Sequence, residues 1–334
     1  GRRGRLGRIV WEQTRLTGLI AREKPDVFHA PAFVLPGRLS VPTVATIHDL
    51  VFMRYPETFG YFRRNYFQWA IPRSAYRATR IIADSEATRR DLVDLLQVRP
   101  ERISVVPLGV GSEFFEPASA EAKQQLRSLL HLPTPRLKPG ANPEGYVLTV
   151  GTIEPRKNLV RLVEAYEIVR RRLGRRCPAL VLVGRKGWMW GEVFERIEQR
   201  GLAGDVIWSD FLSDDLVRAA YQGAALFVCL SLHEGFGLPL LEAMASGVAV
   251  IASGRSSMPE VVGEAGVLVD PGDVRAVAEA MADLLSDEDK RSGFAAKARE
   301  RARTFSWQLT AQRTLAIYEE VGARNLTGFT GLTG

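Results

Sequence analysis

Short apolar stretches alternate along this chain with segments of helical spacing. The stretches are rich in Val, Ile and Leu, and each ends at glycine or polar residues. Continuous apolar runs separated by helices are typical of parallel strands that are buried on both faces of a sheet. Four stretches lie in the first third and six in the later part: PDVFHA, TVATIHDL, ATRIIADSEAT and RISVVPLGV, then YVLTVGTIEPRKN, ALVLVGRKGW, DVIWSDFLS, ALFVCLSLHEGFG, VAVIASG and AGVLVDPGD. The pattern predicts an α/β protein with two series of parallel strands.

A segment without either pattern separates the two series. Residues 131–145 combine four prolines, two glycines and few apolar residues, which predicts an exposed loop. We place the domain boundary near Pro117, so that residues 1–117 form the first domain and residues 118–305 the second. The last helical pattern, at 306–325, is expected to pack back on the first domain.

Length and composition indicate a globular protein. With 334 residues and 46% hydrophobic content, the chain can bury a core in each of two domains. It shows no apolar run long enough for a membrane span and no signal peptide, so we expect a cytoplasmic location. Cys177 and Cys229 both border apolar stretches, which favours packing residues over a disulfide or a metal site.

Positive charge is concentrated in the first third of the chain. The net charge is +7, and residues 1–110 carry 18 Lys and Arg against 10 Asp and Glu. This asymmetry indicates an anionic membrane surface, a phosphorylated substrate or nucleic acid as partner, or else only solvated helix faces. No nucleic-acid-binding motif accompanies the charge, so we expect no nucleic-acid partner. Residues 54–80 mix six arginines with eight aromatics, which suits either peripheral contact with the inner membrane face or ordinary packing.

Ligands of open parallel sheets bind where the strands end, and the stretch GTIEPRKN lies at such a point. The strand ends at Val150, Gly151 follows it, and Asn158 is placed to cap the next helix. Helix N-termini attract phosphate, and Arg156 and Lys157 add two full charges there. The alternative is a solvated pair of basic residues in a surface turn.

A second strand end carries the stretch HEGFGLPLLEAMASG. Gly235 and Gly237 permit a tight turn, and Pro239 suits the first turn of a short helix. Glu234 precedes this turn and Glu242 lies one turn into the helix, so both carboxylates can face one crevice. Carboxylates accept strong hydrogen bonds from sugar hydroxyls, while the amides of the turn suit an anion. Glu242 could instead be a solvated helix residue.

Other residue patterns narrow the chemistry. The four histidines, at positions 29, 48, 131 and 233, have no spacing typical of metal ligands. His48 ends the stretch TVATIH, a position at which packing is commoner than catalysis. The motifs GxGxxG, GxxxxGK[ST] and GxSxG do not occur, which disfavours dehydrogenases, P-loop enzymes and α/β-hydrolases. We therefore expect a site that works without a metal or a cofactor.

Six motifs in order resemble the retaining glycosyltransferases of family 4, which have the GT-B fold. They are IHDLVFMRYPET, DSEATRRDL, VGTIEPRKNL, EGFGLPLLEAMASG with its E-x7-E pattern, SSMPEVVGEAGVLVDPGD and FSWQLTA. The resemblance spans about residues 25 to 320. It implies two Rossmann-like domains that face each other across a cleft, with a nucleotide sugar held mainly by the second.

The resemblance also implies roles for individual residues. Glu234 would contact the donor sugar, and Glu242 would contact the ribose hydroxyls. Lys157 matches the family's diphosphate-binding lysine. The usual arginine partner of that lysine is here Thr152, and we expect Arg156 to supply the charge instead.

The other positions to which the resemblance assigns a role lie in the backbone turns and in the first domain. His48 matches a first-domain histidine near the donor sugar. The amides of the turn after Glu234 would hold the diphosphate and sugar, and the strand-end glycines would line the donor. Together with Thr152, the expected donor-binding positions are Gly151, Gly184, Gly235, Phe236, Gly237 and Leu238.

The resemblance implies transfer of a hexose, of mannose or glucose type, from a GDP- or UDP-sugar with retention of configuration. The acceptor would be a hydroxyl of a glycan or of a lipid-linked saccharide. In one respect the chain departs from the family: it opens at GRRGRLGRIVWEQTRL, which predicts a helix, so the first domain is expected to lack its opening strand. A module that binds a nucleotide sugar without transferring it is therefore the alternative hypothesis.

Overall fold

The computed structural model describes residues 4–131 and 145–328, which divide into two compact units. Unit 1 is formed by Gly1–Leu108 together with Gln308–Gly334, and unit 2 by Gly109–Trp307. Each unit contains one parallel sheet with helices, and each of the ten predicted apolar stretches contains a strand. The predicted α/β class with two parallel sheets is confirmed.

Unit 1 has a four-stranded sheet in which strand order follows chain order, β1-β2-β3-β4. The strands are β1 (Phe28–Ala30), β2 (Thr43–Ile47), β3 (Arg80–Ala83) and β4 (Ile103–Val105). All are parallel, and β2 is buried along its whole length. Its continuous apolar sequence is thus explained by helices that cover both faces of the sheet.

The helices of unit 1 connect these strands. They are α1 (Arg5–Gln13), α2 (Arg15–Glu23), α3 (Val51–Arg54), α4 (Tyr61–Arg77) and α5 (Glu86–Leu96). The opening segment is thus helical, as predicted. At the start of α5 the Ser85 hydroxyl accepts a hydrogen bond from the Thr88 amide at 3.1 Å, which caps the helix.

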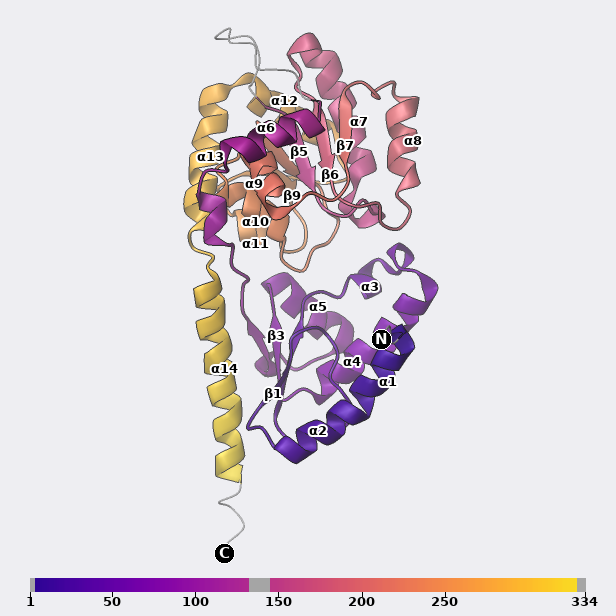
Figure 1. The fold of residues 1–334 in the computed structure, drawn as a ribbon, viewed down its shortest axis with the longest axis vertical. Helices are drawn as coiled ribbons and strands as arrows, with labels where there is room; N and C mark the ends of the chain where they lie inside the picture. The colour runs from indigo at the N-terminus through magenta and orange to yellow at the C-terminus, as the bar shows by residue number, and fades with distance from the viewer. Residues whose placement is uncertain (1–3, 132–144, 329–334) are drawn as a thin grey trace, which may run out of the picture. The chain divides into compact units, whose positions relative to one another are not determined.

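The last helix, α14 (Trp307–Gly328), returns to unit 1. Its residues Ile317 and Val321 are buried against Val44, Ile82 and Val106 of the sheet and of the segment after it. The α14 ribbon runs alongside the strands of this unit (Figure 1). Unit 1 is therefore built from two separate stretches of the chain.

Unit 2 has a six-stranded parallel sheet in the order β10-β9-β8-β5-β6-β7. Its strands are β5 (Val147–Val150), β6 (Leu180–Val183), β7 (Val206–Ser209), β8 (Leu226–Cys229), β9 (Val250–Ser253) and β10 (Val267–Val269). The chain moves outward from β5 to β7 and then crosses to β8 on the other side of β5. The connections that follow β5 and β8 consequently run to opposite faces of the sheet, and the point between these two strands is where ligands bind in such sheets.

The strand order determines which face of the sheet each helix of unit 2 covers. They are α6 (Ala120–Leu129), α7 (Leu159–Leu173), α8 (Gly191–Gln199), α9 (Asp214–Gln222), α10 (Leu238–Ala245), α11 (Met258–Val262), α12 (Val274–Ser286) and α13 (Glu288–Ala302). Right-handed crossovers put α7 and α8 on one face of the sheet, and α9, α10 and α11 on the other. Helix α12 packs against α7, and α6 packs beside α9 (Figure 1).

The chain passes from unit 1 to unit 2 between Leu108 and Gly109, whereas the sequence pattern placed the boundary near Pro117. The intervening residues belong to unit 2 because Val110 pairs with Ser306 there. The predicted loop at 131–145 lies almost entirely outside the described residues.

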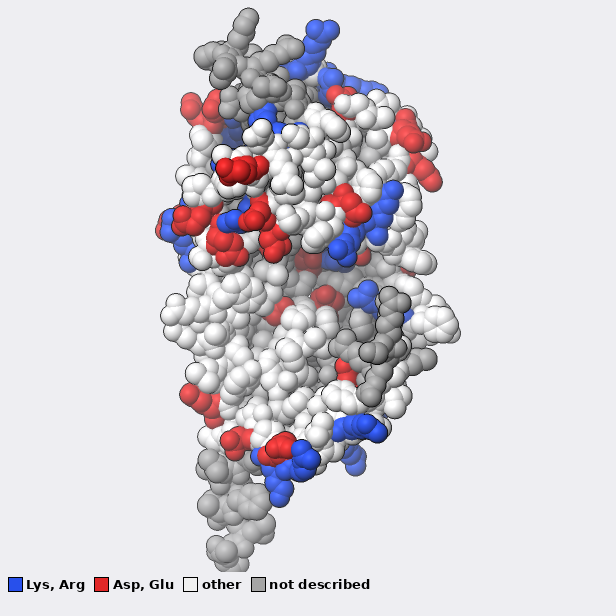
Figure 2. Space-filling model, viewed as in Figure 1, with Lys and Arg blue, Asp and Glu red and all other residues white. Residues whose placement is uncertain are grey.

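Charges of both signs are interspersed on the face of the molecule shown in Figure 2, and most of that face is formed by other residues. Within residues 4–131 and 145–328, none of the helices combines the length and the apolar character that crossing a membrane requires.

Core packing of unit 2 yields a stability prediction. Leu162 of α7 is 0% exposed, and truncation to alanine should lower the free energy of unfolding by about 2–5 kcal/mol through lost burial and a cavity. Ile168 of the same helix is 40% exposed, so Ile168→Ala is a matched control. It should change the free energy of unfolding by about 0.5 kcal/mol or less. Urea unfolding followed by circular dichroism measures both, and equal shifts would contradict the assignment of the core.

Candidate functional site

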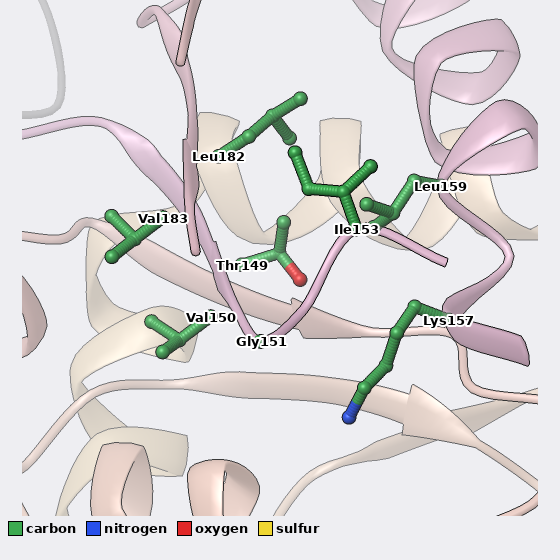
Figure 3. A pocket seen from close by; sticks show the side chains of 8 residues that line it. All are labelled: Thr149, Val150, Gly151, Ile153, Lys157, Leu159, Leu182 and Val183. Carbon is green, nitrogen blue, oxygen red and sulfur yellow. The ribbon is translucent and has the colours of Figure 1, made fainter. Parts of the chain in front are cut away.

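Two neighbouring loops, after β5 and after β8, carry the polar residues of unit 2 that the sequence singled out. The loop after β5 begins at Gly151, whose φ is +148°, a conformation that glycine alone adopts readily. A Cβ on Gly151 would lie 3.1 Å from Cε of Lys157. In Figure 3 the apolar side chains of Ile153, Leu159 and Leu182 group on one side of this loop, and Lys157 points away from them. The glycine thus leaves room for the lysine to lie across the end of the strand.

Gly184, after β6, supports the same loop. Its φ is +145°, and a Cβ there would lie only 2.0 Å from the carbonyl oxygen of Gly151. Beyond this contact Ile153 and Lys186 form an isolated parallel bridge. The two strand-end glycines therefore let adjacent backbones touch, and they hold the loop after β5 in place.

Arg156 and Lys157 lie in the 3-10 turn η4 (Pro155–Lys157) and both bind Glu234. Lys157 Nζ is 2.7 Å from Glu234 Oε1, and the Arg156 guanidinium donates to Oε2. Arg156 also donates to the His233 carbonyl at 3.0 Å and to Glu154 at 2.7 Å. The side chains of Lys157 and Glu234 are only 13% and 12% exposed. The basic pair is therefore no solvated surface feature: it joins the loop after β5 to the loop after β8.

The charge of Glu234 is fixed by this arrangement. Burial alone would raise the pKa of its carboxyl, but Lys157 and Arg156 outweigh burial and lower that pKa to about 2. Glu234 is consequently ionised throughout the neutral range and can only accept hydrogen bonds. The two cations in turn are held in defined positions by a carboxylate that offsets part of their charge.

Two serines hold the turn after Glu234. The Ser256 hydroxyl accepts from the Glu234 amide at 3.2 Å and donates to its carbonyl at 2.7 Å. The Ser257 hydroxyl lies 2.9 Å from the carbonyl oxygens of both Glu234 and Phe236. These contacts fix the backbone through Gly235 and Phe236 from a neighbouring loop.

Gly237 completes the turn and precedes α10. Its φ is +105°, and a Cβ there would lie 2.6 Å from Cε of Met258. The structure thus requires glycine at this position, whereas Gly235 has no positive φ. In the first turn of α10, Pro239 has no N–H, and the Leu240 and Leu241 amides donate to the Gly237 carbonyl at 3.0 and 3.1 Å. The Leu238 amide is the first-turn donor without a backbone acceptor among the described contacts, and it lies at the positive end of the helix dipole.

Glu242 lies on the second turn of α10, half-buried, and its Oε2 accepts a hydrogen bond from the Tyr221 hydroxyl at 2.8 Å. Burial raises the pKa of its carboxyl, and the Tyr221 hydrogen bond opposes that rise. The two carboxylates of the E-x7-E motif therefore have different surroundings: Glu234 is bound by cations and Glu242 by a neutral donor.

His48 lies in unit 1, just after β2, with both ring nitrogens hydrogen-bonded. Nδ1 is 2.7 Å from Asp84 Oδ2, and Nε2 is 2.9 Å from the Pro31 carbonyl oxygen. The Asp84 hydrogen bond is the main cause that raises the pKa of His48. Two acceptors facing one ring favour the imidazolium, which donates from both nitrogens. The Phe33 ring packs edge-on against it at 5.1 Å.

The structure brings Arg156, Lys157 and Glu234 into contact with one another. Thr152 is not part of this cluster. Thr152 is exposed, with its methyl group beside Gly187.

Sequence reasoning missed several supporting residues. Ser256 and Ser257 stand in the quoted motif SSMPEVVGEAG, and Asp84 in ATRIIADSEAT, but nothing in the spacing connects them to Glu234 or His48. Tyr221 lies in a segment without any motif.

The arrangement in unit 2 combines groups for two kinds of ligand atom. Two cations and a helix N-terminus suit a diphosphate, because positive charge and directed amides both stabilise anionic oxygens. Two carboxylates suit hydroxyl groups, since each can accept short hydrogen bonds from them. Chemically the site fits a molecule that carries both a diphosphate and sugar rings.

Family comparisons agree with this chemistry. Residues 136–301 match the model "Glycosyl transferases group 1", and residues 1–114 match "Glycosyltransferase Family 4". Solved structures with the same fold include a glycosyltransferase from Rickettsia africae, with a TM-score of 0.72 and 18% identity, covering 96% of this chain and 83% of that one. Anabaena Alr3699/HepE in complex with UDP has a TM-score of 0.67 and 21% identity, covering 84% and 72%.

Among curated proteins, the chain is similar to O-antigen chain mannosyltransferase B of Escherichia coli. The two are 32% identical over 89% of this chain and 74% of that protein. The serotype-specific mannosyltransferase WbdA of Escherichia coli is also 32% identical, over 87% of this chain, but the chain spans only 36% of its length. On the family models and the first of these relatives, the chain belongs to the family 4 glycosyltransferases of the GT-B fold.

Proposed function

We propose that this protein transfers a hexose of mannose type from a nucleotide-diphosphate sugar to a hydroxyl of a glycan or lipid-linked saccharide. The transfer would retain the configuration of the sugar and need no metal. The observation that carries the proposal is the Arg156–Glu234–Lys157 cluster at the switch point of the sheet in unit 2. The mannose assignment is supported by similarity to proteins named as mannosyltransferases.

Positive charge at the site supports transfer without a metal. When the bond between sugar and diphosphate breaks, negative charge grows on the leaving oxygen. Lys157, Arg156 and the Leu238 amide at the start of α10 would stabilise that charge, the task that a metal ion performs in other transferases. Because Glu234 already holds both cations in place, little reorganisation would accompany the reaction.

The carboxylates would orient the donor. Glu234 stays ionised because the pKa of its carboxyl is about 2, so it would accept hydrogen bonds from sugar hydroxyls and would not shuttle protons. Glu242 would accept from the ribose. His48, held by Asp84, would donate to the donor sugar after exchanging the Pro31 carbonyl for a ligand oxygen.

The site of unit 2 alone would also suit a module that binds a nucleotide sugar without transferring it. Binding of the donor without formation of a free or transferred sugar would single out that alternative.

Helix α4 supports a further part of the proposal, contact with an anionic membrane that carries the acceptor. Its aromatic residues Tyr61, Phe62 and Trp69 are 65%, 87% and 54% exposed. Arg63 and Arg73 lie on the same helix and are exposed too, and Arg73 stands over the Trp69 ring. Basic and aromatic side chains together suit the interface of an anionic bilayer.

Nucleotide binding provides a direct test of the donor site. Calorimetric titration with GDP and with UDP should show binding of one of them, unchanged by EDTA. Glu242→Gln should weaken it about 10-fold or more, because a neutral amide replaces the charged acceptor of the ribose hydroxyls. Glu279→Gln on α12 changes an acidic residue outside the site and serves as the control. If Glu242→Gln binds as tightly as the wild type, the assignment of the donor site is wrong.

Transition-state stabilisation by Lys157 is tested by kinetics. Lys157→Met should lower kcat for GDP-mannose turnover about 10²–10³-fold, with water or an added oligomannoside as acceptor, because one cation at the leaving group is lost. Proton NMR of the first-formed product should show the α configuration of the donor. Lys290→Met on α13 is the matched control. Inversion at the anomeric carbon, or a requirement for added Mg²⁺, would contradict the proposed mechanism.

Membrane contact is tested by flotation with vesicles. Wild-type protein should float with phosphatidylglycerol-containing vesicles and not with phosphatidylcholine alone. Arg63→Gln and Arg73→Gln should each weaken binding about 5-fold, from about 1 kcal/mol per basic residue at an anionic surface. Arg303→Gln in unit 2 is the control. Equal flotation with both kinds of vesicle would remove this part of the proposal.

A further inference from the structure

We propose that Tyr221 is a positioning residue for the donor site: it orients Glu242 and presents the second carboxylate oxygen of that residue to the ribose of the nucleotide. This inference rests on the proposed function, since it takes Glu242 as the ribose contact. It assigns a role to a buried residue that belongs to none of the motifs.

The Tyr221 hydroxyl has little freedom to move. The residue lies near the end of α9 and is 0% exposed. Its ring meets Phe114 at 6.0 Å and Phe227 at 5.6 Å between centroids, so aromatic neighbours from the 3-10 turn η3 (Ser112–Phe115) and from β8 hold it on two sides. A hydroxyl on a ring packed in this way is a fixed donor, and the carboxylate that accepts from it is fixed as well.

Glu242 gives only one oxygen to Tyr221. The Tyr221 hydroxyl lies 2.8 Å from Oε2, and the Glu242 side chain has no second hydrogen-bonding partner among the residues that the structure describes. Its neighbours Leu241 and Ala243 are fully buried, while Glu242 itself is only half-buried. Oε1 is therefore the oxygen left to accept from a ligand hydroxyl.

The charges around Glu242 make this donor more important. Burial is the main cause that raises the pKa of the carboxyl, and Asp214 of α9 and Glu113 of η3 raise it further. The hydrogen bond from Tyr221 favours the charged form and lowers the pKa. No cation is bound to Glu242 among the described contacts, in contrast to Glu234. The Tyr221 hydroxyl is thus the group that favours a charged acceptor at this position.

The primary test is Tyr221→Phe, which keeps the buried ring and removes the hydroxyl. The affinity for GDP or UDP, whichever the wild type binds, should fall about 10-fold, as expected for a lost hydrogen bond to a charged group. The 2′,3′-dideoxy form of the same nucleotide lacks the hydroxyls, so its affinity should change less than about 2-fold. Tyr146→Phe is the matched control, because the buried Tyr146 hydroxyl donates at 2.7 Å to the Ala220 carbonyl instead.

The pH dependence separates positioning from a structural role. Nucleotide affinity should fall as pH drops through the pKa of Glu242, because protonation removes the charged acceptor. Without the Tyr221 hydroxyl that pKa rises, so the acid limb of the affinity profile should move to higher pH. In a Glu242→Gln background, Tyr221→Phe should change neither the nucleotide affinity nor its pH profile. The two substitutions together thus form a double-mutant cycle.

The outcomes are distinguishable. Tyr221→Phe behaving like Tyr146→Phe, or weakening dideoxy and ordinary nucleotide equally, would overturn the role of Tyr221 and leave the proposed function standing. The same holds for an effect of Tyr221→Phe that persists in the Glu242→Gln background. A Glu242→Gln variant that binds as tightly as the wild type would overturn the proposed donor site itself.

Discussion

The salt bridges of Glu234 to Arg156 and Lys157 are the interaction on which the candidate site depends. They join the loops after β5 and β8, two strands that are adjacent in the sheet but separated by β6 and β7 in the chain. Partly buried cations cost solvation free energy unless a carboxylate faces them, and the partly buried carboxylate needs the cations equally. Each loop is thus stabilised in its position by the other.

Steric fit supports this electrostatic link. Gly184 touches the Gly151 carbonyl, and Gly151 makes room for Lys157, so the lysine reaches Glu234 only because two successive strands end in glycine. Gly237 allows the turn after Glu234 to pass Met258. The glycines of the motifs therefore have a geometric purpose that is separate from ligand binding.

The sequence was sufficient to predict the strands, and the structure brings together Arg156, Lys157 and Glu234, three charged residues that the sequence singled out. Apolar runs between helical segments identify β2 or β8 without any knowledge of tertiary structure, because their burial on both faces requires such runs. Strand order is different: the adjacency of β5 and β8 is not encoded in any local pattern, so the partnership of Lys157 with Glu234 could not be derived from spacing. Tyr221 and Asp84 were not predicted for the same reason, since each is hydrogen-bonded to a residue of another element. The structure divides the chain between Leu108 and Gly109, whereas the sequence pattern placed the boundary near Pro117, because Val110 pairs with a residue near the other end of unit 2.

Because α14 returns to unit 1, the two units become complete at different points during synthesis of the chain. Unit 2 is continuous from Gly109 to Trp307 and can complete its core as soon as those residues have left the ribosome. One face of the unit 1 sheet, around Val44 and Ile82, stays uncovered until Ile317 and Val321 arrive. Although domains generally fold in the order of synthesis, here the unit that is translated first is completed last. Until α14 has been made, this apolar face is exposed in the nascent chain, and exposed apolar surface of this kind makes a partly folded protein prone to aggregation.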